Sequence, residues 1–231
     1  MNGQVTEHVY AVDVGALSLF LIVLPEGLTL IDAGFEGSMA AIEEAVRALG
    51  RRPDEIRDIL GTHAHPDHSC GLAQVKAATG ARLWMHPAEA AMVRAGRTFR
   101  PWEPAPGQKN RDFAAHIILA SPQTCTPVEV DQEVQPEETI LVAGGIRALG
   151  TPGHALGHLA FLWPGDGGVL FVGDAANNVD ELGLSPIYED LDEGLASLRR
   201  LGQEEFETAC FAHGAPIMGN AAAVFRARWG T

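Results

Sequence analysis

The most informative segment of the chain is Thr62-His63-Ala64-His65-Pro66-Asp67-His68, in which three histidines and one aspartate fall within six residues. The apolar run before it is typical of a strand, and a residue that precedes proline prefers an extended backbone. His63 and His65 stand two positions apart in extended chain, so we expect their side chains on the same side. Proline suits the first turn of a helix, which would carry the aspartate and the last histidine. The two pairs of side chains can serve two adjacent metal ions better than one.

Four further polar side chains stand directly after apolar, strand-like runs. They are Asp32, His154, Asp174 and His213. If the strands present a common edge, these side chains converge there with residues 62–68, because sites in layered α/β folds lie beyond the carboxyl ends of the strands. Imidazole nitrogen and carboxylate oxygen are ligands of zinc and similar divalent metals. The combined pattern indicates a metal site.

The rest of the chain alternates strand and helix patterns, which favours a layered α/β fold. Apolar β-rich runs predict strands over residues 5–14, 17–24, 28–31, 56–60, 82–85, 139–142, 146–149, 159–163, 169–172 and 209–212. Apolar spacing of three and four residues predicts helices over 38–49, 72–78, 87–95, 191–201 and 221–229, the first capped by Ser38. The length of 231 residues suits a single domain over residues 1–231.

Residues 96–136 form an insertion in this pattern. They carry six prolines and several charges with weak periodicity, and they predict one short helix at about 112–119. Arg100 and Trp102 belong to a mixture of cationic and aromatic side chains that suits a lid in contact with a substrate. A homodimer interface or a solvated loop is an equal alternative for this segment.

The composition and net charge of the chain limit the kinds of partner that we expect it to bind. Lysine and arginine number 16 against 30 aspartates and glutamates, a net charge of −14 that repels phosphate backbones and argues against general nucleic-acid binding. The N-terminal residues lack the pattern of a signal peptide, and no apolar run is long enough for a membrane span. The three cysteines are odd in number and widely spaced, so we expect packing roles for Cys70, Cys125 and Cys210. We therefore expect a cytoplasmic protein that acts on a small molecule, with neither a nucleic-acid nor a membrane partner.

Taken in order, the motifs resemble those of the metallo-β-lactamase superfamily. The matching segments are LIDAG around Asp32, THAHPDH at residues 62–68, TPGH ending at His154, VGDA around Asp174 and AHG around His213. The resemblance covers the chain from about residue 5 to the C-terminus, apart from the insertion. It implies a four-layer αββα sandwich with a dinuclear metal site at one edge of the sheets.

The same resemblance implies which residues hold the two ions. One ion would be bound by His63, His65 and His154, the other by Asp67, His68 and His213, and Asp174 would bridge them. We expect zinc, with manganese or iron as alternatives. A hydroxide shared by two such cations stays deprotonated near neutral pH, and Asp67 would also orient it for attack. Asp32 is expected to hydrogen-bond to the ligand loops, and His158 to have a similar supporting role.

Residues that differ from those of known branches of the superfamily limit the classes of substrate that we expect. Asp174 stands where one β-lactamase subclass has a metal-binding cysteine, which disfavours a true β-lactamase. Glyoxalase-type thioesterases have a helical C-terminal domain, whereas 18 residues follow His213 here. Many lactonases of the superfamily have tyrosine where this chain has Asn177. Asn177 and Tyr188 are candidate substrate contacts in the loop after Asp174, with packing an equal alternative for Tyr188.

These features favour a metal-dependent hydrolase that uses a metal-bridging hydroxide to attack a small ester, lactone or thioester. One alternative is an iron-dependent persulfide dioxygenase, which the resemblance also allows because those enzymes share the scaffold. Others are a phosphodiesterase and a non-catalytic, metal-stabilised binding protein. Metal content separates the first two readings, because two equivalents of zinc or manganese fit the hydrolase and one equivalent of iron fits the oxygenase.

Overall fold

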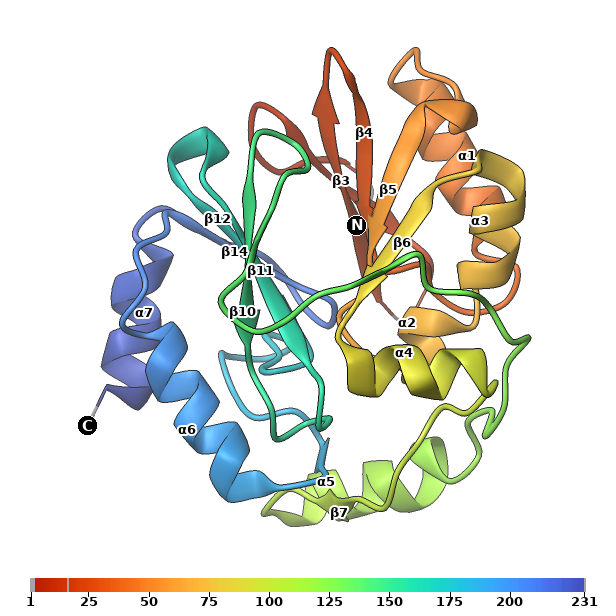
Figure 1. Cartoon of the computed structure of the whole chain (residues 1–231). Helices are drawn as coiled ribbons and strands as arrows, with labels where there is room; N and C mark the ends of the chain where they lie inside the picture. Colours follow the sequence, from red (N-terminus) through yellow and green to blue (C-terminus); the bar gives the residue numbers. More distant parts are fainter. Residues whose placement is uncertain (1–2, 16, 231) are drawn as a thin grey trace.

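Two β-sheets lie face to face in the computed structural model, which describes residues 3–15 and 17–230 (Figure 1). The first sheet has the strand order β1-β2-β3-β4-β5-β6-β8. Its strands are β1 Gly3–Gln4, β2 Val9–Asp13, β3 Ser18–Leu24, β4 Gly27–Ile31, β5 Ile56–Leu60, β6 Arg82–Met85 and β8 Gln132–Glu133. Strands β2, β3 and β4 are antiparallel neighbours, whereas β4, β5, β6 and β8 run parallel to one another.

The second sheet has the order β15-β14-β12-β11-β10-β9. Its strands are β9 Thr139–Ile140, β10 Ile146–Gly150, β11 Leu159–Trp163, β12 Val169–Gly173, β14 Thr208–Phe211 and β15 Ile217–Met218. Strand β11 is antiparallel to both β10 and β12, and β12 is parallel to β14, so β10, β12 and β14 run in the same direction. A separate pair joins β7 Glu103–Pro104 to β13 Ile187–Tyr188.

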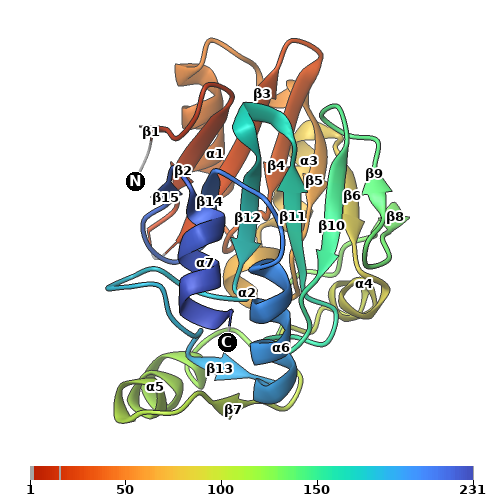
Figure 2. The ribbon, with the colours of Figure 1, turned by 90° about the vertical axis from the view of Figure 1, so that its left-hand side faces the viewer.

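Helices cover the outer face of each sheet. They are α1 Met39–Ala48, α2 Pro66–Ser69, α3 Leu72–Thr79 and α4 Pro87–Arg94 on the side of the first sheet, and α6 Leu191–Leu201 and α7 Ala221–Trp229 on the side of the second. Figures 1 and 2 show α1 and α3 against one sheet and α6 and α7 against the other. This arrangement confirms the predicted αββα sandwich. Ser38 stands at the N-cap of α1, but its backbone is already helical and its side chain makes no capping hydrogen bond.

Three apolar cores separate the four layers, because side chains alternate between the two faces of each strand. In β3, Leu19 and Leu21 pack toward α1, where they join Ile42. Phe20 faces the second sheet instead, and its ring lies 5.7 Å from that of Phe171 in β12. A third core lies between the second sheet and helices α6 and α7. Helices on both outer faces explain why the central strands are apolar along nearly their whole length.

The strand directions bring several strand ends to one edge of the sandwich. Strands β4 and β5 are parallel neighbours in the first sheet, and β10, β12 and β14 share a direction in the second. Each of these strands is followed by one of the polar motifs noted in the sequence. The fold therefore fixes where these motifs meet, and the cores hold the strands that present them.

Residues 96–136 lie across the same edge. They contain β7, helix α5 Gln108–Phe113, the π-helical turn η2 Ala114–Ile118 and β8. The helix predicted at 112–119 therefore begins four residues earlier, at Gln108. Figures 1 and 2 place α5 and β7 at the lower end of the sandwich, beyond the ends of the strands.

Cys70 and Cys125 form a disulfide, with their Cα atoms 5.1 Å apart. The expectation that both are simple packing residues is therefore wrong, because a spacing of 55 residues gave no sign that the fold brings them together. The bond joins the end of α2, directly after the histidine-rich stretch, to the segment that follows η2. Cys210 is buried and unpaired, as expected of a packing residue.

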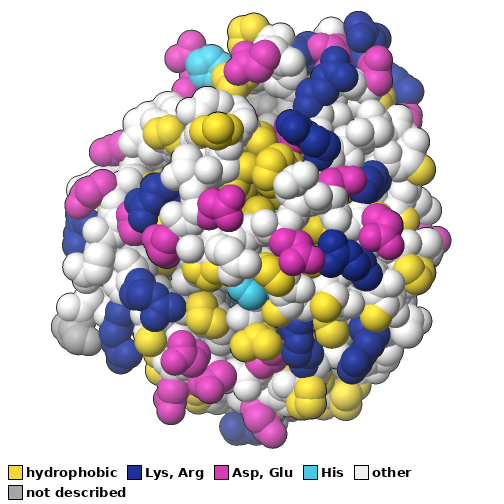
Figure 3. Space-filling model, viewed as in Figure 1, with side chains coloured by type: hydrophobic (Ala, Val, Ile, Leu, Met, Phe, Trp, Pro, Cys, Tyr) yellow, Lys and Arg dark blue, Asp and Glu magenta, His cyan; other side chains and the backbone are white. Residues whose placement is uncertain are grey.

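The surface carries charges of both signs. Figure 3 shows acidic and basic side chains interspersed over the face seen in Figure 1, with apolar side chains between them. None of the helices within residues 3–15 and 17–230 has both the length and the apolar character that crossing a membrane requires.

Candidate metal centre

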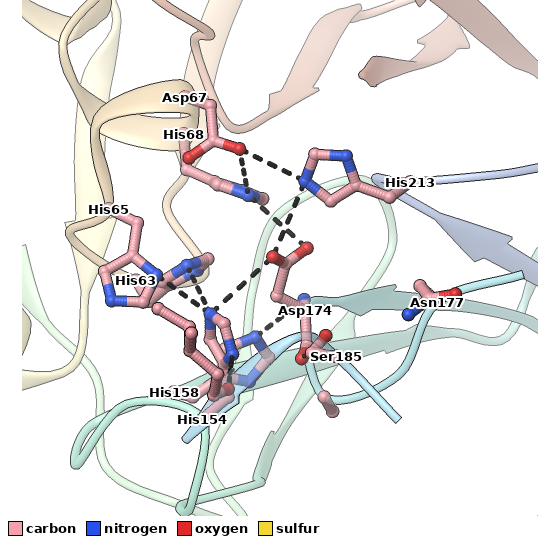
Figure 4. A network of polar contacts seen from close by, with 12 residues as sticks. His63, His65, Asp67, His68, His154, His158, Asp174, Asn177, Ser185 and His213 are labelled. Carbon is pink, nitrogen blue, oxygen red and sulfur yellow. Dashed lines mark hydrogen bonds and ion pairs between the residues drawn. The ribbon is translucent and has the colours of Figure 1, made fainter. Parts of the chain in front are cut away.

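The seven residues expected to bind metal converge at the edge where the strands end (Figure 4). The stretch 62–68 follows β5, and His154, Asp174 and His213 follow β10, β12 and β14. Their ligand atoms form three groups of three, and within each group every pair of atoms lies within 4.8 Å: His63, His65 and His154; His63, His68 and Asp174; Asp67, His68 and His213. The first sheet supplies two members of every group and the second sheet supplies one.

The three-histidine cluster consists of His63, His65 and His154. Nε2 of His154 lies 3.2 Å from Nε2 of His63 and 2.9 Å from Nδ1 of His65. All three rings are buried. The backbone explains the position of His65, because this residue is extended at φ −61° and ψ 152° and α2 begins at the proline that follows.

The aspartate cluster consists of Asp67, His68 and His213. Oδ2 of Asp67 lies 3.1 Å from Nε2 of His213 and 3.7 Å from Nε2 of His68. The side chains of Asp67 and His213 keep 21% and 23% of their exposure, whereas that of His68 is fully buried. This cluster therefore faces the open side of the centre.

The carboxylate of Asp174 lies between the two clusters. Its Oδ2 atom is 3.6 Å from Nε2 of His154 and 3.5 Å from Nε2 of His213, and its Oδ1 atom is 3.4 Å from Nε2 of His68. Figure 4 shows this side chain in the middle of the network, with contacts to both sides. One carboxylate is thus in reach of both clusters.

Hydrogen bonds behind the centre fix which ring nitrogen of each histidine faces it. Asp32 accepts hydrogen bonds from the backbone N–H and hydroxyl of Thr62 at 2.7 and 2.8 Å. Because that hydroxyl donates to Asp32, it accepts from Nδ1 of His63 at 2.9 Å. Nδ1 of His68 donates to Asp32 at 2.8 Å, and Nδ1 of His154 donates to the carbonyl of Ile187 at 2.9 Å. The Nε2 atoms of His63, His68 and His154 are therefore left to face the centre.

Asp32 and His158, the two residues predicted to support the ligands, make hydrogen bonds behind the centre. Asp32 is a buried residue that adopts φ 59°, in the left-handed region that non-glycine residues rarely occupy. This conformation turns its carboxylate toward both Thr62 and His68. His158 accepts a hydrogen bond on Nε2 from the backbone N–H of Asp174 at 3.0 Å, and its Nδ1 contacts the hydroxyl of Thr151 at 2.6 Å. It thereby holds the backbone that carries Asp174.

The electrostatics of the two clusters differ. Burial lowers the pKa of each ring in the three-histidine cluster, and neighbouring histidines lower those of His63 and His65 further. Burial would also lower the pKa of His68 and His213, but nearby carboxylates outweigh it, so the first is raised well above its usual value and the second to about 9. Burial would raise the pKa of Asp67, but His68 and His213 hold it at about 2.

Divalent cations fit both clusters. Nε2 of His68 and Oδ1 of Asp174 are buried and have no hydrogen-bond partner within the described residues, which is costly unless another group satisfies them. The Nε2 atoms of His63 and His154 face each other at 3.2 Å, while the Nδ1 atom of each ring makes the hydrogen bond to its neighbour. Two such lone pairs repel unless a cation lies between them. Imidazole and carboxylate donors are the set that zinc and similar metals take.

The buried carboxylate of Glu89, which the sequence did not predict as a functional residue, links two of the loops that carry metal ligands. Glu89, in α4, is 1% exposed and accepts hydrogen bonds at 3.0 Å from the backbone N–H of Ala64 and from that of Gly157. Ala64 lies between two ligands of the three-histidine cluster, and Gly157 follows its third ligand by three residues. A lone glutamate on a helix has no motif around it, so nothing in the sequence could single it out.

Arg100 extends this network of contacts behind the metal centre. It is not among the residues that line the cavity beside the centre. Its guanidinium contacts Glu89 at 2.8 Å and Glu189 at 3.2 Å. Glu189 in turn accepts a hydrogen bond from the backbone N–H of Leu156 at 3.0 Å. Arg100, a predicted substrate contact, is thus held by two carboxylates behind the cavity lining.

Of the other three candidate substrate contacts, one lines the cavity and two do not. Asn177 lines the cavity at the centre, and its amide donates to the carbonyl of Leu184 at 2.6 Å. Tyr188 is buried, and its hydroxyl accepts from the N–H of Ser185 and donates to the carbonyl of Ala175, so it packs beneath the site. Trp102 is half-buried away from the cavity lining. Neither Tyr188 nor Trp102 is among the residues that line the cavity.

The centre opens into a cavity of about 860 Å³. Its floor includes ligand side chains from both clusters, among them His65, Asp67 and His213. Its walls are largely apolar and come from α5, η2 and the loop between β12 and β13. Phe99, which belongs to the cationic and aromatic side chains noted in the insertion, is another wall residue, and its ring lies 4.6 Å from that of His65.

Comparison with known families agrees with this centre. Residues 12–213 match the family model described as the metallo-beta-lactamase superfamily. A hydroxyacylglutathione hydrolase of Cereibacter sphaeroides is 29% identical over 189 residues, which cover 79% of this chain and 59% of that protein. A hydrolase of the same name from Hyphomonas neptunium is 30% identical over 63% of this chain and 43% of its own length. The chain thus spans about half the length of these curated relatives.

Solved structures agree at the level of the fold. A HARLDQ-motif mutant of a metallo-beta-lactamase from Cronobacter sakazakii superposes with a TM-score of 0.70 at 26% identity, covering 92% of this chain and 80% of the other. The subclass B3 enzyme BJP-1 of Bradyrhizobium japonicum gives a TM-score of 0.71 at 23% identity, covering 99% and 90%.

Proposed function

The chain belongs to the metallo-beta-lactamase superfamily, and from that premise we propose that it is a dinuclear metallohydrolase of small esters, lactones or thioesters. The observation that carries the proposal is the position of Asp174, whose Oδ2 lies about equally far from a histidine of each cluster. A carboxylate in that position suits a bridge between two cations. The hydrolase names of the curated relatives support the same reaction class, with an acyl thioester as one candidate substrate.

In this proposal the two clusters hold one divalent ion each, and zinc is the ion that their donors suit best. A bound pair of ions supplies an activated water and Lewis-acid polarisation of the substrate's acyl oxygen. The chain's own contribution is to keep the donor atoms aimed at the centre. Asp32 does so through Thr62 and His68, and His158 does so through the backbone of Asp174.

Asp67 is proposed to orient the attacking water as well as to bind metal. Its side chain is partly exposed and lines the cavity, so its carboxylate can accept a hydrogen bond from a molecule that enters there. Nε2 of His213 contacts Oδ2 of this carboxylate at 3.1 Å, which helps to orient the Asp67 side chain. The wall residue Phe99 excludes bulk water beside His65, which strengthens electrostatic interactions at the centre.

Metal content and hydrolysis test this proposal together. Protein purified without added metal is expected to contain about two equivalents of zinc or manganese and to hydrolyse simple esters, lactones or thioesters until a chelator removes the metal. One equivalent of iron with oxygen uptake on a persulfide would overturn the proposal in favour of an oxygenase. Metal-replete protein with neither activity would overturn it in favour of a binding role.

A further inference from the structure

The cavity beside the metal centre has apolar walls. Side chains of Phe113, Ile117 and Ile118 approach it from α5 and η2, Leu184 approaches it from the loop after β12, and Ile187 from the start of β13. Its volume of about 860 Å³ is in the range of roughly 300–1,000 Å³ that holds drug-sized ligands. The space therefore accepts far more than the reacting group itself.

Two of these wall residues are poorly buried by the protein. Phe113 is 40% exposed and Ile117 is 51% exposed, although both are large and apolar. Covering such side chains with an apolar group removes their surface from water and favours binding. Both lie in the segment that crosses the edge of the sandwich, so a ligand that reaches from the centre along α5 and η2 would cover them.

The charges around the cavity are mostly acidic. Lys109 is the one lysine or arginine that lines it among the described residues, and this side chain is ion-paired with Asp180. Glu181 also lines the cavity away from the centre, whereas Asp67 and Asp174 at the floor are carboxylates that the two proposed ions would neutralise. A ligand with several carboxylates would find no unpaired cation along these walls, and repulsion from the acidic groups would oppose it.

We propose that the substrate is an uncharged acyl compound whose apolar chain or ring lies between η2 and the loop after β12, with its ester, lactone or thioester carbonyl at the metal centre. This inference rests on the proposed function and specifies its substrate class. The α5–η2 segment is then the element that selects the acyl group. Anionic conjugates, such as thioesters of glutathione, fit this cavity less well than neutral esters of the same acyl group.

A series of p-nitrophenyl esters from acetate to decanoate, with one leaving group, tests the apolar site in the metal-loaded protein. We expect kcat/KM to rise by about fourfold for each methylene that enters the cavity, until the chain outgrows it. In a second series, neutral N-acetylcysteamine thioesters are expected to be better substrates than glutathione thioesters of the same acyl group.

A matched pair of variants locates the effect. Ile117→Asp places a charge on the wall and is expected to reduce the octanoate-to-acetate ratio of kcat/KM by at least tenfold. Leu119→Asp makes the same kind of change two residues away, at a 67% exposed side chain outside the cavity lining, and is expected to leave that ratio as it is. Phe113→Ser provides a second wall variant if Ile117→Asp fails to fold, as judged by circular dichroism and metal content.

The outcomes separate the two levels of the proposal. If acetate is hydrolysed but the rate does not depend on chain length, or if glutathione thioesters are preferred, the apolar acyl site is wrong while the hydrolase stands. If protein with two equivalents of metal hydrolyses none of these compounds, the proposed function itself fails. Equal loss of the octanoate preference in the Leu119 and Ile117 variants would also overturn the location of the site.

Discussion

The two clusters beside Asp174 differ in charge and in access. The three-histidine cluster consists of buried imidazoles whose pKa values are lowered, so each ring presents a lone pair at neutral pH. The aspartate cluster contains a carboxylate, histidines with raised pKa, and two side chains that are partly open to the cavity. From this difference we expect the first cluster to anchor an ion and the second to be the more accessible to water and substrate.

Removal of the shared carboxylate should break both clusters. Asp174→Ala is expected to reduce the affinity for both ions by more than about 100-fold, beyond the loss typical of residues that only support a ligand, and to abolish hydrolysis. Elemental analysis after dialysis measures the loss. Asp180→Ala, which removes an exposed carboxylate from the cavity rim, is the control and should keep both ions. Retention of two ions by the Asp174 variant would show that this residue is no bridge.

Single-histidine variants should separate the clusters. His154→Ala is expected to empty the three-histidine cluster and His213→Ala the aspartate cluster, so that each variant keeps about one equivalent of metal. Cobalt substitution distinguishes the two remaining sites, because the all-imidazole site and the site with a carboxylate give different absorption spectra. If either variant loses both ions, the clusters are not independent and the comparison between them fails.

The buried glutamate should matter to one cluster alone. Glu89→Gln leaves one acceptor oxygen where the carboxylate uses two, so a backbone hydrogen bond to Ala64 or Gly157 is lost. We expect about a 10- to 100-fold loss of affinity at the three-histidine cluster, the range for residues that orient metal ligands, and little change at the aspartate cluster. Glu133→Gln, at a partly exposed ion pair with Arg94, is the matched control. An equal loss at both clusters would contradict the assignment.

Metal uptake should respond to pH differently at the two clusters. With a pKa of about 9, His213 of the metal-free protein holds an extra proton at pH 7, and this proton must leave before the ring can bind a metal. Affinity at the aspartate cluster is therefore expected to rise by about tenfold per pH unit for each proton released, up to about pH 9. The lowered pKa values of the other cluster predict a flat profile above pH 7. Titration calorimetry in two buffers counts the protons; a flat profile at both clusters would refute this difference.

The smallest effect on the metal centre is expected from the disulfide. Cys70→Ser should leave both ions in place and lower the free energy of unfolding by about 2–4 kcal/mol, the usual contribution of such a bond. Denaturant titration measures the stability, and Cys210→Ser serves as a control at a buried thiol outside the bond. Loss of metal from the Cys70 variant would show that the link also positions His68. The comparison of variants needs oxidising conditions, because reducing compartments remove most disulfides.

The layers were predictable because they depend on local patterns, whereas the assignment of ligands to the two ions rests on the resemblance of the motifs to the superfamily and stays a prediction. Apolar strands with a polar residue directly after them identify the strand ends, and the proline in residues 62–68 marks the change from strand to helix. The alternation of strands and helices then limits the fold to a layered sandwich. The nitrogen of His65 that faces its neighbours, Nδ1, depends on ring orientation, which no spacing rule determines.

The rest could not be read from the chain because it depends on contacts between distant residues. Glu89 reaches Gly157 across 68 positions, and Cys70 reaches Cys125 across 55. Arg100 looked like a substrate contact because its neighbours are aromatic and cationic, whereas its partners Glu89 and Glu189 lie 11 and 89 positions away in the sequence. The apolar wall of the cavity was hidden for the same reason, since η2 lies in a segment of weak periodicity.

Every ligand group takes two members from the first sheet and one from the second. The chain passes from one sheet to the other between β8 and β9, in an exposed stretch. A cut at that point would therefore give two fragments, neither of which holds all three members of any one group. Metal uptake by a mixture of the two fragments would then report their reassociation, so the centre can serve as a built-in sensor of fragment complementation.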